Sequence, residues 1–364
     1  MLRITVTFVV SILAYLLILP VLFILVPIWI FSSLVNSVNA LLGMGDFSPW
    51  SYTPWEGIVR FEPEIGWVPR ANLDTMYLER TGDICSVKTD SEGWPGEPSI
   101  EESDVVAFGD SFAFGYGVDS DRAYYSLVKG CKVKPIAVPG YNMVQALMLM
   151  RRYSDRLKGK TIVWFICTEN DLIENVKAYL PKIGYRTPYI RNIGRSDDWE
   201  VVSEHVKEER WLFGEERANN KQLFAKLCSP TNYAERIYSA TKFLIQEAKK
   251  LCDEAECRMV IFAIPFKDSL SQSGRRNLRK LLADVTSFDT NIPVNKIHDI
   301  CDQVSVPYIS GVSELTLNDY KVRDGHWNVN GNRKVAKMIG EYHCCPVKSD
   351  LGVYDNSKIT KQSL

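Results

Sequence analysis

Five short apolar runs, separated by longer amphipathic stretches, constrain the fold of this chain more than any other feature. The runs are residues 104–109, 134–138, 161–166, 258–264 and 306–310. Between them, residues 143–158 and 232–251 carry apolar side chains three and four positions apart, a spacing that predicts helices. Strands that are apolar along their whole length are buried on both faces. The alternation therefore predicts an α/β sandwich around a mostly parallel five-stranded sheet.

Length and charge narrow the class of protein. A chain of 364 residues with 46% hydrophobic content buries a sizeable core, as one large or two modest domains. Its 43 basic side chains nearly balance its 44 acidic ones. Such a balance gives no electrostatic attraction for a phosphate backbone, so no nucleic-acid partner is expected.

The N-terminal region carries no charged side chain between Arg3 and Asp46. Within it, the apolar stretch over residues 4–31 exceeds the roughly 20 residues that span a bilayer. A cleavable signal peptide has a shorter apolar region followed by a small-residue cleavage site, and neither is evident. The sequence therefore predicts a retained transmembrane helix and then an interfacial stretch over residues 32–43, the whole anchor occupying residues 1–45.

Few basic residues flank this anchor, so they give only a weak indication of its orientation in the membrane. Arg3 precedes the apolar stretch, whereas Arg60 and Arg70 follow at a distance, which favours a cytoplasmic N-terminus. We therefore expect a single-pass membrane protein with its globular part in the periplasm or extracellular space. Nine cysteines permit disulfides there, but their odd number leaves at least one unpaired, and the sequence assigns no pairing.

Changes in composition divide the rest of the chain. Residues 46–103 are rich in Pro, Gly, Trp and acidic residues, which predicts turns with short strands. The α/β pattern runs over residues 104–345 and is followed by a tail, residues 346–364. Charged clusters in residues 176–230 interrupt the pattern after the third apolar run, which indicates an insertion. Two interpretations stay open for it, a lid or substrate wall at the sheet edge and a solvated charged excursion.

Ser111 follows directly on the first predicted strand, where the next helix begins. A hydroxyl there is exposed at the carboxyl edge of the sheet, beside backbone N–H groups that stabilise an oxyanion. It suits a nucleophile, but a helix cap is an equally simple role for serine. Gly109, Gly115 and Gly117 suggest a phosphate cradle instead, but a Walker lysine is absent and Ser120 stands where the dinucleotide fingerprint needs glycine.

A serine nucleophile needs a base, and the chain has four histidines. His205 lies in the charged insertion and His298 in an amphipathic stretch, so ordinary surface or core roles suit them. His326 stands in a glycine-containing turn before a predicted helix, with Asp324 two residues earlier. A carboxylate so close fixes the imidazole tautomer and stabilises the imidazolium that forms when histidine takes a proton from serine.

Four segments in this order resemble the successive sequence blocks of the SGNH, or GDSL, hydrolase family. They are residues 109–112 (Gly-Asp-Ser-Phe), Gly140, residues 170–171 (Asn-Asp) and residues 324–328 (Asp-Gly-His-Trp-Asn). The resemblance covers about residues 104–345. It implies a flavodoxin-like, three-layer α/β/α fold for this hydrolase-like domain.

The resemblance also implies a role for each matching residue. Ser111 is the expected nucleophile, His326 the base and Asp324 the carboxylate that orients the base. The expected oxyanion donors are the backbone N–H groups of Ser111 and Gly140 and the side-chain amide of Asn170. The remaining block residues, Asp110, Asp171 and Trp327, are expected to support the site, Trp327 either as a pocket wall or as core.

Two positions depart from the family pattern. Thr168 stands where the third block usually begins with glycine, and Arg323 stands where the last block usually has aspartate, three residues before the histidine. Asp324 lies one residue closer to the histidine, a spacing similar to that of some relatives that O-acetylate envelope polysaccharides.

The resulting hypothesis is a membrane-anchored serine esterase or deacylase that acts on an ester of a small molecule, glycan or lipid outside the cytosol. Two alternatives stay open: an O-acetyltransferase of envelope polysaccharide with the same triad, and a non-catalytic glycan-binding subunit. No cofactor is expected. No metal is expected either, because residues 343–345 (His-Cys-Cys) have no second ligand pair at zinc spacing. Cys167 is expected to pack in the core, and the oligomeric state is not predicted.

Overall fold

The computed structural model describes residues 55–79, 82–176, 179–180, 185–194, 198–203, 220–282 and 287–344. The predicted anchor, the predicted tail, His205 and Cys345 lie outside these ranges. Among the described helices, none combines the length and the apolar character that crossing a bilayer requires.

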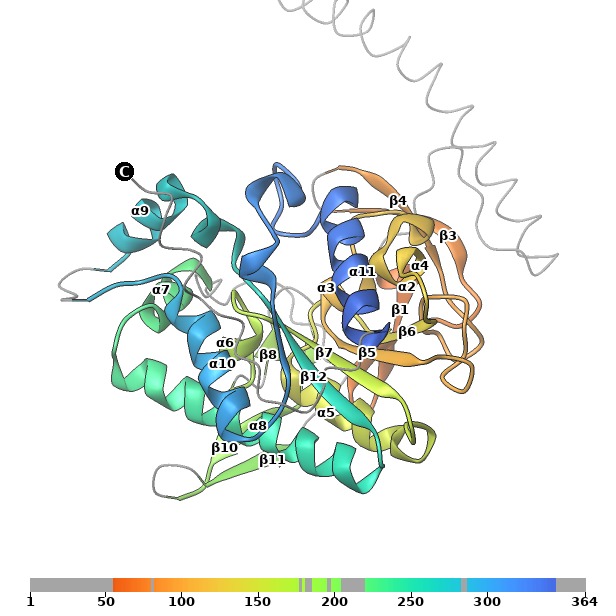
Figure 1. Ribbon diagram of the computed structural model, residues 1–364, viewed down its shortest axis with the longest axis horizontal. Helices are drawn as coiled ribbons and strands as arrows, with labels where there is room; N and C mark the ends of the chain where they lie inside the picture. The colour runs from red at the N-terminus through yellow and green to blue at the C-terminus, as the bar shows by residue number, and fades with distance from the viewer. Residues whose placement is uncertain are drawn as a thin grey trace, which may run out of the picture.

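A five-stranded parallel sheet forms the centre of the molecule (Figure 1). Its strands are β5 (Val105–Gly109), β6 (Val133–Ala137), β7 (Thr161–Cys167), β12 (Arg258–Ile264) and β13 (Tyr308–Ser310). Each of the five apolar runs forms one of these strands, so the predicted α/β class and parallel sheet are confirmed. The spatial order is β6-β5-β7-β12-β13, with every neighbouring pair parallel. In chain order this is 2-1-3-4-5, the order of flavodoxin-like sheets.

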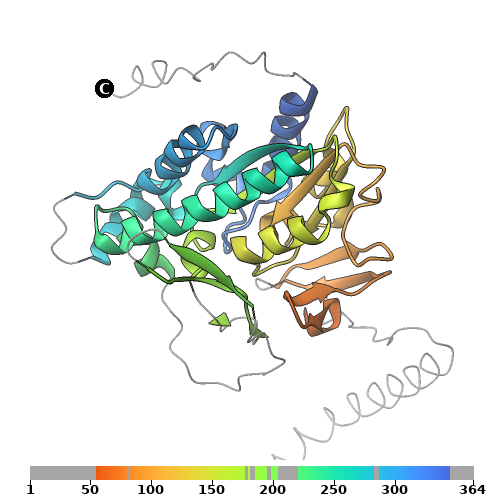
Figure 2. The same ribbon diagram turned by 90° about the horizontal axis from the view of Figure 1, so that it is seen from below.

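Helices pack against the sheet in two groups. The first group, α5 (Met143–Arg152), α8 (Asn232–Glu254) and α10 (Ile292–Gln303), contact one another in series, and Figure 2 shows α5 and α8 side by side. The second group is α4 (Tyr124–Leu127) and α11 (Val329–Cys344), which contact each other. The β5-to-β6 connection runs across the sheet in the opposite direction to the later ones. Right-handed crossovers therefore place the two groups on opposite faces.

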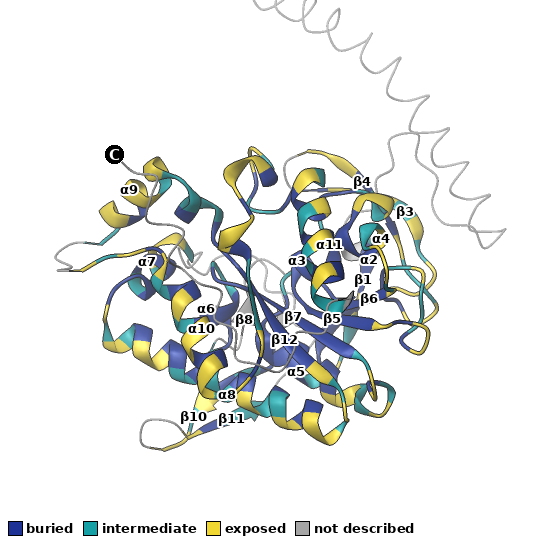
Figure 3. Cartoon of the chain, in the orientation of Figure 1, coloured by how far each residue is buried: buried dark blue, intermediate teal, exposed yellow. Residues whose placement is uncertain are grey.

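The strands are buried along their length because helices cover them. All residues of β5, β6 and β7 are buried, which Figure 3 shows as a dark blue centre. The helix α5 begins at a capping box, in which Asn142 and Gln145 each accept a hydrogen bond from the other's backbone N–H at 3.0 Å. It ends at Arg152, earlier than the apolar pattern predicts, because the chain tightens into a short 3₁₀ helix, Ser154–Arg156.

The segment before β5 is part of the same packed unit. It comprises α2 (Trp55–Ile58) and two antiparallel hairpins, β1 (Val59–Glu62) with β2 (Gly66–Pro69) and β3 (Asp74–Leu78) with β4 (Ile84–Lys88). The Tyr141 hydroxyl donates to the Trp67 carbonyl at 2.5 Å. In β6 the fully buried ammonium of Lys134 pairs with Asp90 at 2.7 Å. A hydrogen bond and an ion pair thus join this segment to β6 and to the loop before α5.

The described parts of the predicted insertion are also packed against the core. They are β8 (Tyr179–Leu180), β9 (Tyr185–Arg186), β10 (Tyr189–Asn192), β11 (Trp199–Val202) and α7 (Asn220–Leu227). The indole of Trp199 donates to the Ser239 hydroxyl on α8 at 2.9 Å. Three more short helices, α3 (Ser111–Phe114), α6 (Asp171–Glu174) and α9 (Gln272–Lys280), follow the carboxyl ends of β5, β7 and β12.

Candidate active site

The turn between β5 and α3 presents Ser111 at the carboxyl edge of the sheet. Gly109 has a φ of 151°, and a Cβ on it would lie 3.0 Å from the Phe165 carbonyl oxygen, so this position requires glycine. Asp110 is the N-cap of α3, because its Oδ1 accepts from the Phe112 N–H at 2.9 Å. The cap role that the sequence left open for Ser111 therefore falls to Asp110, and the Ser111 hydroxyl is not used for it.

The imidazole of His326 lies between Ser111 and Asp324. Its Nε2 is 2.7 Å from the Ser111 hydroxyl, and its Nδ1 is 2.8 Å from Oδ2 of Asp324. The other oxygen of Asp324 accepts from the Gly325 N–H at 2.6 Å. Because a carboxylate only accepts, the proton of a neutral imidazole belongs on Nδ1, and Nε2 then accepts from the serine hydroxyl. This arrangement suits proton removal from Ser111.

Aromatic rings surround the imidazole. The His326 ring lies 5.0 Å from that of Phe112 and 4.9 Å from that of Tyr116, measured between centroids. Trp327 is only 2% exposed and packs edge-on against Phe112 at 4.7 Å and against Phe165 at 6.0 Å. Trp327 is therefore part of the core, which was one of its two predicted roles. It packs against Phe112, whose ring contacts His326.

Both predicted oxyanion donors outside the serine turn follow sheet strands that neighbour β5. Gly140 comes three residues after β6, has a φ of 84°, and its N–H makes no hydrogen bond within the described part of the chain. Asn170 lies at the start of α6, just after β7. Its amide nitrogen donates to Oδ1 of Asp171 at 2.9 Å and to Oε2 of Glu174 at 3.2 Å. An amide nitrogen carries two hydrogens, so both are engaged.

Two buried carboxyl groups, Asp110 and Asp171, lie beneath the site, and each is 2% exposed. Burial raises the pKa of Asp110 above its usual value. Burial, followed by the charge of Asp110, raises the pKa of Asp171 well above its usual value. Oδ2 of Asp171 accepts from the Cys167 N–H at 2.8 Å, which fixes the end of β7 to α6. Asp171 therefore supports Asn170 and keeps its proton to a higher pH than an exposed aspartate does.

The remaining candidates lie away from this arrangement or do not suit chemistry. Burial raises the pKa of the Cys167 thiol well above its usual value, which disfavours the thiolate a nucleophile requires. His298 is exposed and packs against Tyr308 with 5.0 Å between ring centroids. Among the described residues, Cys85, Cys167, Cys228, Cys252, Cys257 and Cys301 form no disulfide bond. Within the same ranges, no three His, Cys, Asp or Glu side chains gather as metal ligands do.

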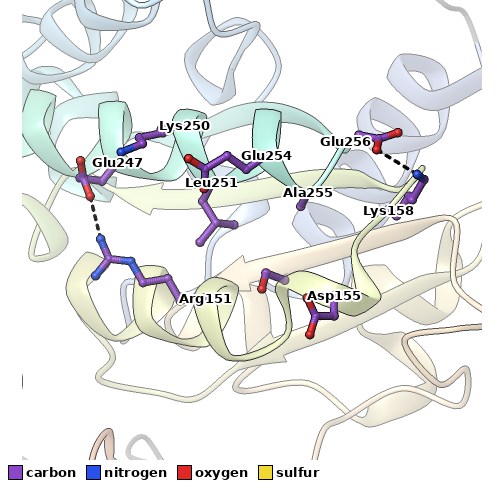
Figure 4. Close-up of a pocket in the computed structure, with 10 residues that line it drawn as sticks. Arg151, Asp155, Lys158, Glu247, Lys250, Leu251, Glu254, Ala255 and Glu256 are labelled. Carbon is purple, nitrogen blue, oxygen red and sulfur yellow. Dashed lines mark hydrogen bonds and ion pairs between the residues drawn. The ribbon is translucent and has the colours of Figure 1, made fainter.

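A charged hollow lies elsewhere, between the C-terminal ends of α5 and α8 (Figure 4). Ion pairs cross it, Arg151 with Glu247 at 2.7 Å and Lys158 with Glu256 at 2.9 Å. None of the residues predicted for the site lines it.

Two residues to which the family resemblance assigns no role help to form the candidate site. The hydroxyl of Thr168 donates to the Ile264 carbonyl and accepts from the Phe266 N–H, both at 3.0 Å, so it clamps the ends of β7 and β12. This contact accounts for the departure from glycine at position 168. Lys267 follows β12 and donates to backbone carbonyls of the turn that carries Asp324. In the sequence, both residues follow predicted strands at the same edge of the sheet, and Thr168 also stands out as a departure from the family pattern.

No family model and no curated protein matches this sequence. Solved structures resemble it at low similarity. An acetyl xylan esterase, AlAXEase, has 12% identity and a TM-score of 0.37, covering 65% of this chain and 96% of that one. A putative arylesterase from Agrobacterium tumefaciens str. C58 has 13% identity and a TM-score of 0.37, covering 65% and 95%. The psychrotrophic esterase EstA from Pseudoalteromonas sp. has 9% identity and a TM-score of 0.30, covering 65% and 97%.

Proposed function

We propose that this protein is a serine esterase or deacylase of the SGNH type, acting through Ser111, His326 and Asp324. One observation carries the proposal: the His326 imidazole hydrogen-bonds a serine hydroxyl with one nitrogen and a buried carboxylate with the other. A serine without such a base is a weak nucleophile. Ser111 is also the first residue of α3, at the carboxyl edge of the sheet, where its backbone N–H suits a developing oxyanion.

The proposed reaction proceeds in two halves. The Ser111 oxygen attacks the acyl carbon of an ester while its proton passes to Nε2 of His326, and Asp324 stabilises the imidazolium. The N–H groups of Ser111 and Gly140 and the Asn170 amide hold the oxyanion. His326 then returns the proton to the departing alcohol, which leaves an acyl-enzyme. Water, deprotonated by His326, attacks that intermediate and releases the acid and free Ser111.

Transfer of the acyl group to a sugar hydroxyl is the second candidate. It uses the same acyl-enzyme, and the spacing of Asp324 and His326 favours it through the resemblance described above. The two functions differ only in which nucleophile reaches the acyl-enzyme, water or an alcohol. Product analysis with an aryl acetate, with and without added oligosaccharide, separates them: free acetate indicates hydrolysis, and acetylated sugar indicates transfer.

Covalent labelling tests the proposal most directly. Purified full-length protein is treated with a fluorophosphonate probe, which reacts with activated serines. We expect wild type and the control Ser126→Ala, which alters an exposed serine on α4, to be labelled, and Ser111→Ala to remain unlabelled. Labelling of Ser111→Ala at the wild-type rate would reject Ser111 as the nucleophile, and a wild type that does not react would favour a glycan-binding subunit.

We also propose that residues 1–45 anchor the protein in a membrane, with the catalytic part outside the cytosol. The uncharged stretch over residues 4–31 supports this proposal. Membrane fractionation and protease accessibility in cells with an intact inner membrane test it. A soluble mature chain that begins near Asp46, or a globular part protected until lysis, would contradict the anchor or the orientation respectively.

A further inference from the structure

The turn that precedes His326 is closed by its own backbone but has little packing on its outer side. The Lys321 N–H donates to the His326 carbonyl at 2.9 Å, and the Asn328 N–H donates to the Asp319 carbonyl at 2.9 Å. Val322, at the apex, is 93% exposed. Apolar burial therefore does not hold this turn in place, although it carries Asp324.

The ammonium of Lys267 binds this turn through three backbone carbonyls. It donates to the carbonyls of Val322 and Asp324, each at 3.0 Å, and to the carbonyl of Lys321. An ammonium has three hydrogens, so all are used, and each of these charge-assisted bonds is stronger than a neutral one. Among the described residues, Lys267 forms no ion pair with a carboxylate, so its charge is directed at the turn.

Lys321 holds the same turn from another direction. Its ammonium lies 2.6 Å from Glu79 and 2.8 Å from Asp83, at the end of the β3–β4 hairpin, and 3.1 Å from the Gly117 carbonyl beyond Ser111. The side chain of Lys321 thus joins the turn to the hairpin and to the loop after α3. Of these two lysines, Lys267 is the one whose ammonium reaches the backbone of Asp324 itself.

We propose that Lys267 is a positioning residue, which fixes the turn so that the Asp324 carboxylate stays against Nδ1 of His326. This proposal rests on the proposed function, since it assigns Lys267 a part in keeping the base oriented. Lys267 acts through Asp324 and does not touch the reacting atoms. If its ammonium is lost, three carbonyls that point at one spot lose their common donor, and the turn relaxes.

Kinetics of Lys267→Met on an aryl acetate test the proposal. We expect kcat to fall by about 10- to 100-fold with little change in KM, because a misplacement of roughly 1 Å at the reacting groups costs about that much. Lys160→Met is the matched control, because Lys160 also binds two backbone carbonyls, those of Glu101 and Ser103, away from the site. It should keep the wild-type kcat. Lys267→Arg, which retains charge and donors, should recover most of the loss.

A double-mutant cycle distinguishes positioning from general support of the fold. If Lys267 acts through Asp324, Lys267→Met should cost little in an Asp324→Asn background, so the two losses should not add. Fully additive losses, or an unchanged kcat in Lys267→Met, would overturn the proposal. Should Lys267→Met fail to fold, Lys267→Gln replaces it with the same expectations.

A proton NMR measurement separates failure of this proposal from failure of the proposed function. The hydrogen bond from Nδ1 of His326 to Asp324 should give a downfield resonance that is absent in His326→Ala, whether or not the protein hydrolyses any ester. We expect Lys160→Met to keep this resonance and Lys267→Met to lose or broaden it. A sharp, unshifted resonance in Lys267→Met would reject the positioning role, even if Ser111 proved to be the nucleophile.

Discussion

The carboxylate of Glu174 lies 3.2 Å from the Asn170 amide nitrogen that the proposed mechanism assigns to the oxyanion. Since Asp171 takes the other amide hydrogen at 2.9 Å, an oxyanion must displace one of the two carboxylates. The longer bond, to Glu174, is the one we expect to break. Glu174→Ala should therefore keep or slightly raise kcat on an aryl acetate. A loss of about 100-fold, the size typical of a lost oxyanion donor, would instead show that Glu174 orients the amide.

Removal of the Asn170 amide tests the donor itself. Asn170→Ala should cost about 10² to 10³ in kcat, the usual effect of one lost oxyanion donor, with KM nearly unchanged. Circular dichroism and urea unfolding report whether α6 survives the change. A rate within threefold of wild type in a folded variant would mean that Ser111 and Gly140 supply the oxyanion donors without it.

Because Ser111 and His326 are hydrogen-bonded and act together, we expect that the reductions in kcat caused by removing each side chain do not add. Ser111→Ala and His326→Ala should each reduce kcat by on the order of 10⁶, and the double variant should be no slower, because the base has no use without the nucleophile. His298→Asn serves as the control, since that imidazole is exposed on α10, and should be nearly silent. Full activity in Ser111→Ala would reject the mechanism.

Asp324→Asn changes the partner of Nδ1 while keeping the shape of the side chain. An amide that donates toward Nδ1 favours the wrong imidazole tautomer, so we expect kcat to fall by about 10⁴. Steady-state kinetics on the same ester measure this. If Asp324→Asn is nearly silent and another carboxylate proves essential, then the orienting group is wrong, although the serine mechanism stands.

The pH dependence of stability tests the buried carboxyl pair. Burial raises the pKa of Asp110 in the folded state, so the folded protein holds this proton to higher pH than the unfolded chain does. The resulting stability is fully present below the unfolded pKa of about 3.9 and is lost as pH rises through the folded pKa. Asp110→Asn keeps the cap on Phe112 and removes this titration. Urea unfolding at about pH 4 and 7 should therefore show a smaller loss of stability in the variant, and equal losses would contradict the prediction.

The sheet could be predicted closely because its strands are buried on both faces, and strands buried in this way appear in the sequence as continuous apolar runs. The prediction for residues 258–264 matches β12 at both ends. The prediction for residues 306–310 is too long at its start, since β13 begins at Tyr308. The Pro307 carbonyl accepts from the Ile261 N–H at 3.0 Å, but proline has no N–H to donate to β12 in return, so the strand begins at the next residue.

The site could be predicted only where a motif marks it. Ser111, Asp324 and His326 stand in short, recognisable blocks, but the hydrogen bonds that Lys267 donates depend on tertiary structure. Lys267 contacts a turn more than 50 positions later in the chain. No local pattern of charge distinguishes it from a lysine on the surface.

The complete burial of Lys134 sets a limit on how far the chain can be shortened for expression. A fragment that begins at residue 104, just before the first strand, would leave this ammonium without Asp90 and without the carbonyls of Trp94 and Gly96. Removing one partner from a buried ion pair costs roughly 3–5 kcal/mol, a large share of the 5–15 kcal/mol that stabilises a typical domain. A fragment trimmed to the four motif blocks would therefore be expected to accumulate as insoluble protein, whereas one that begins near Trp55 retains every partner of this lysine.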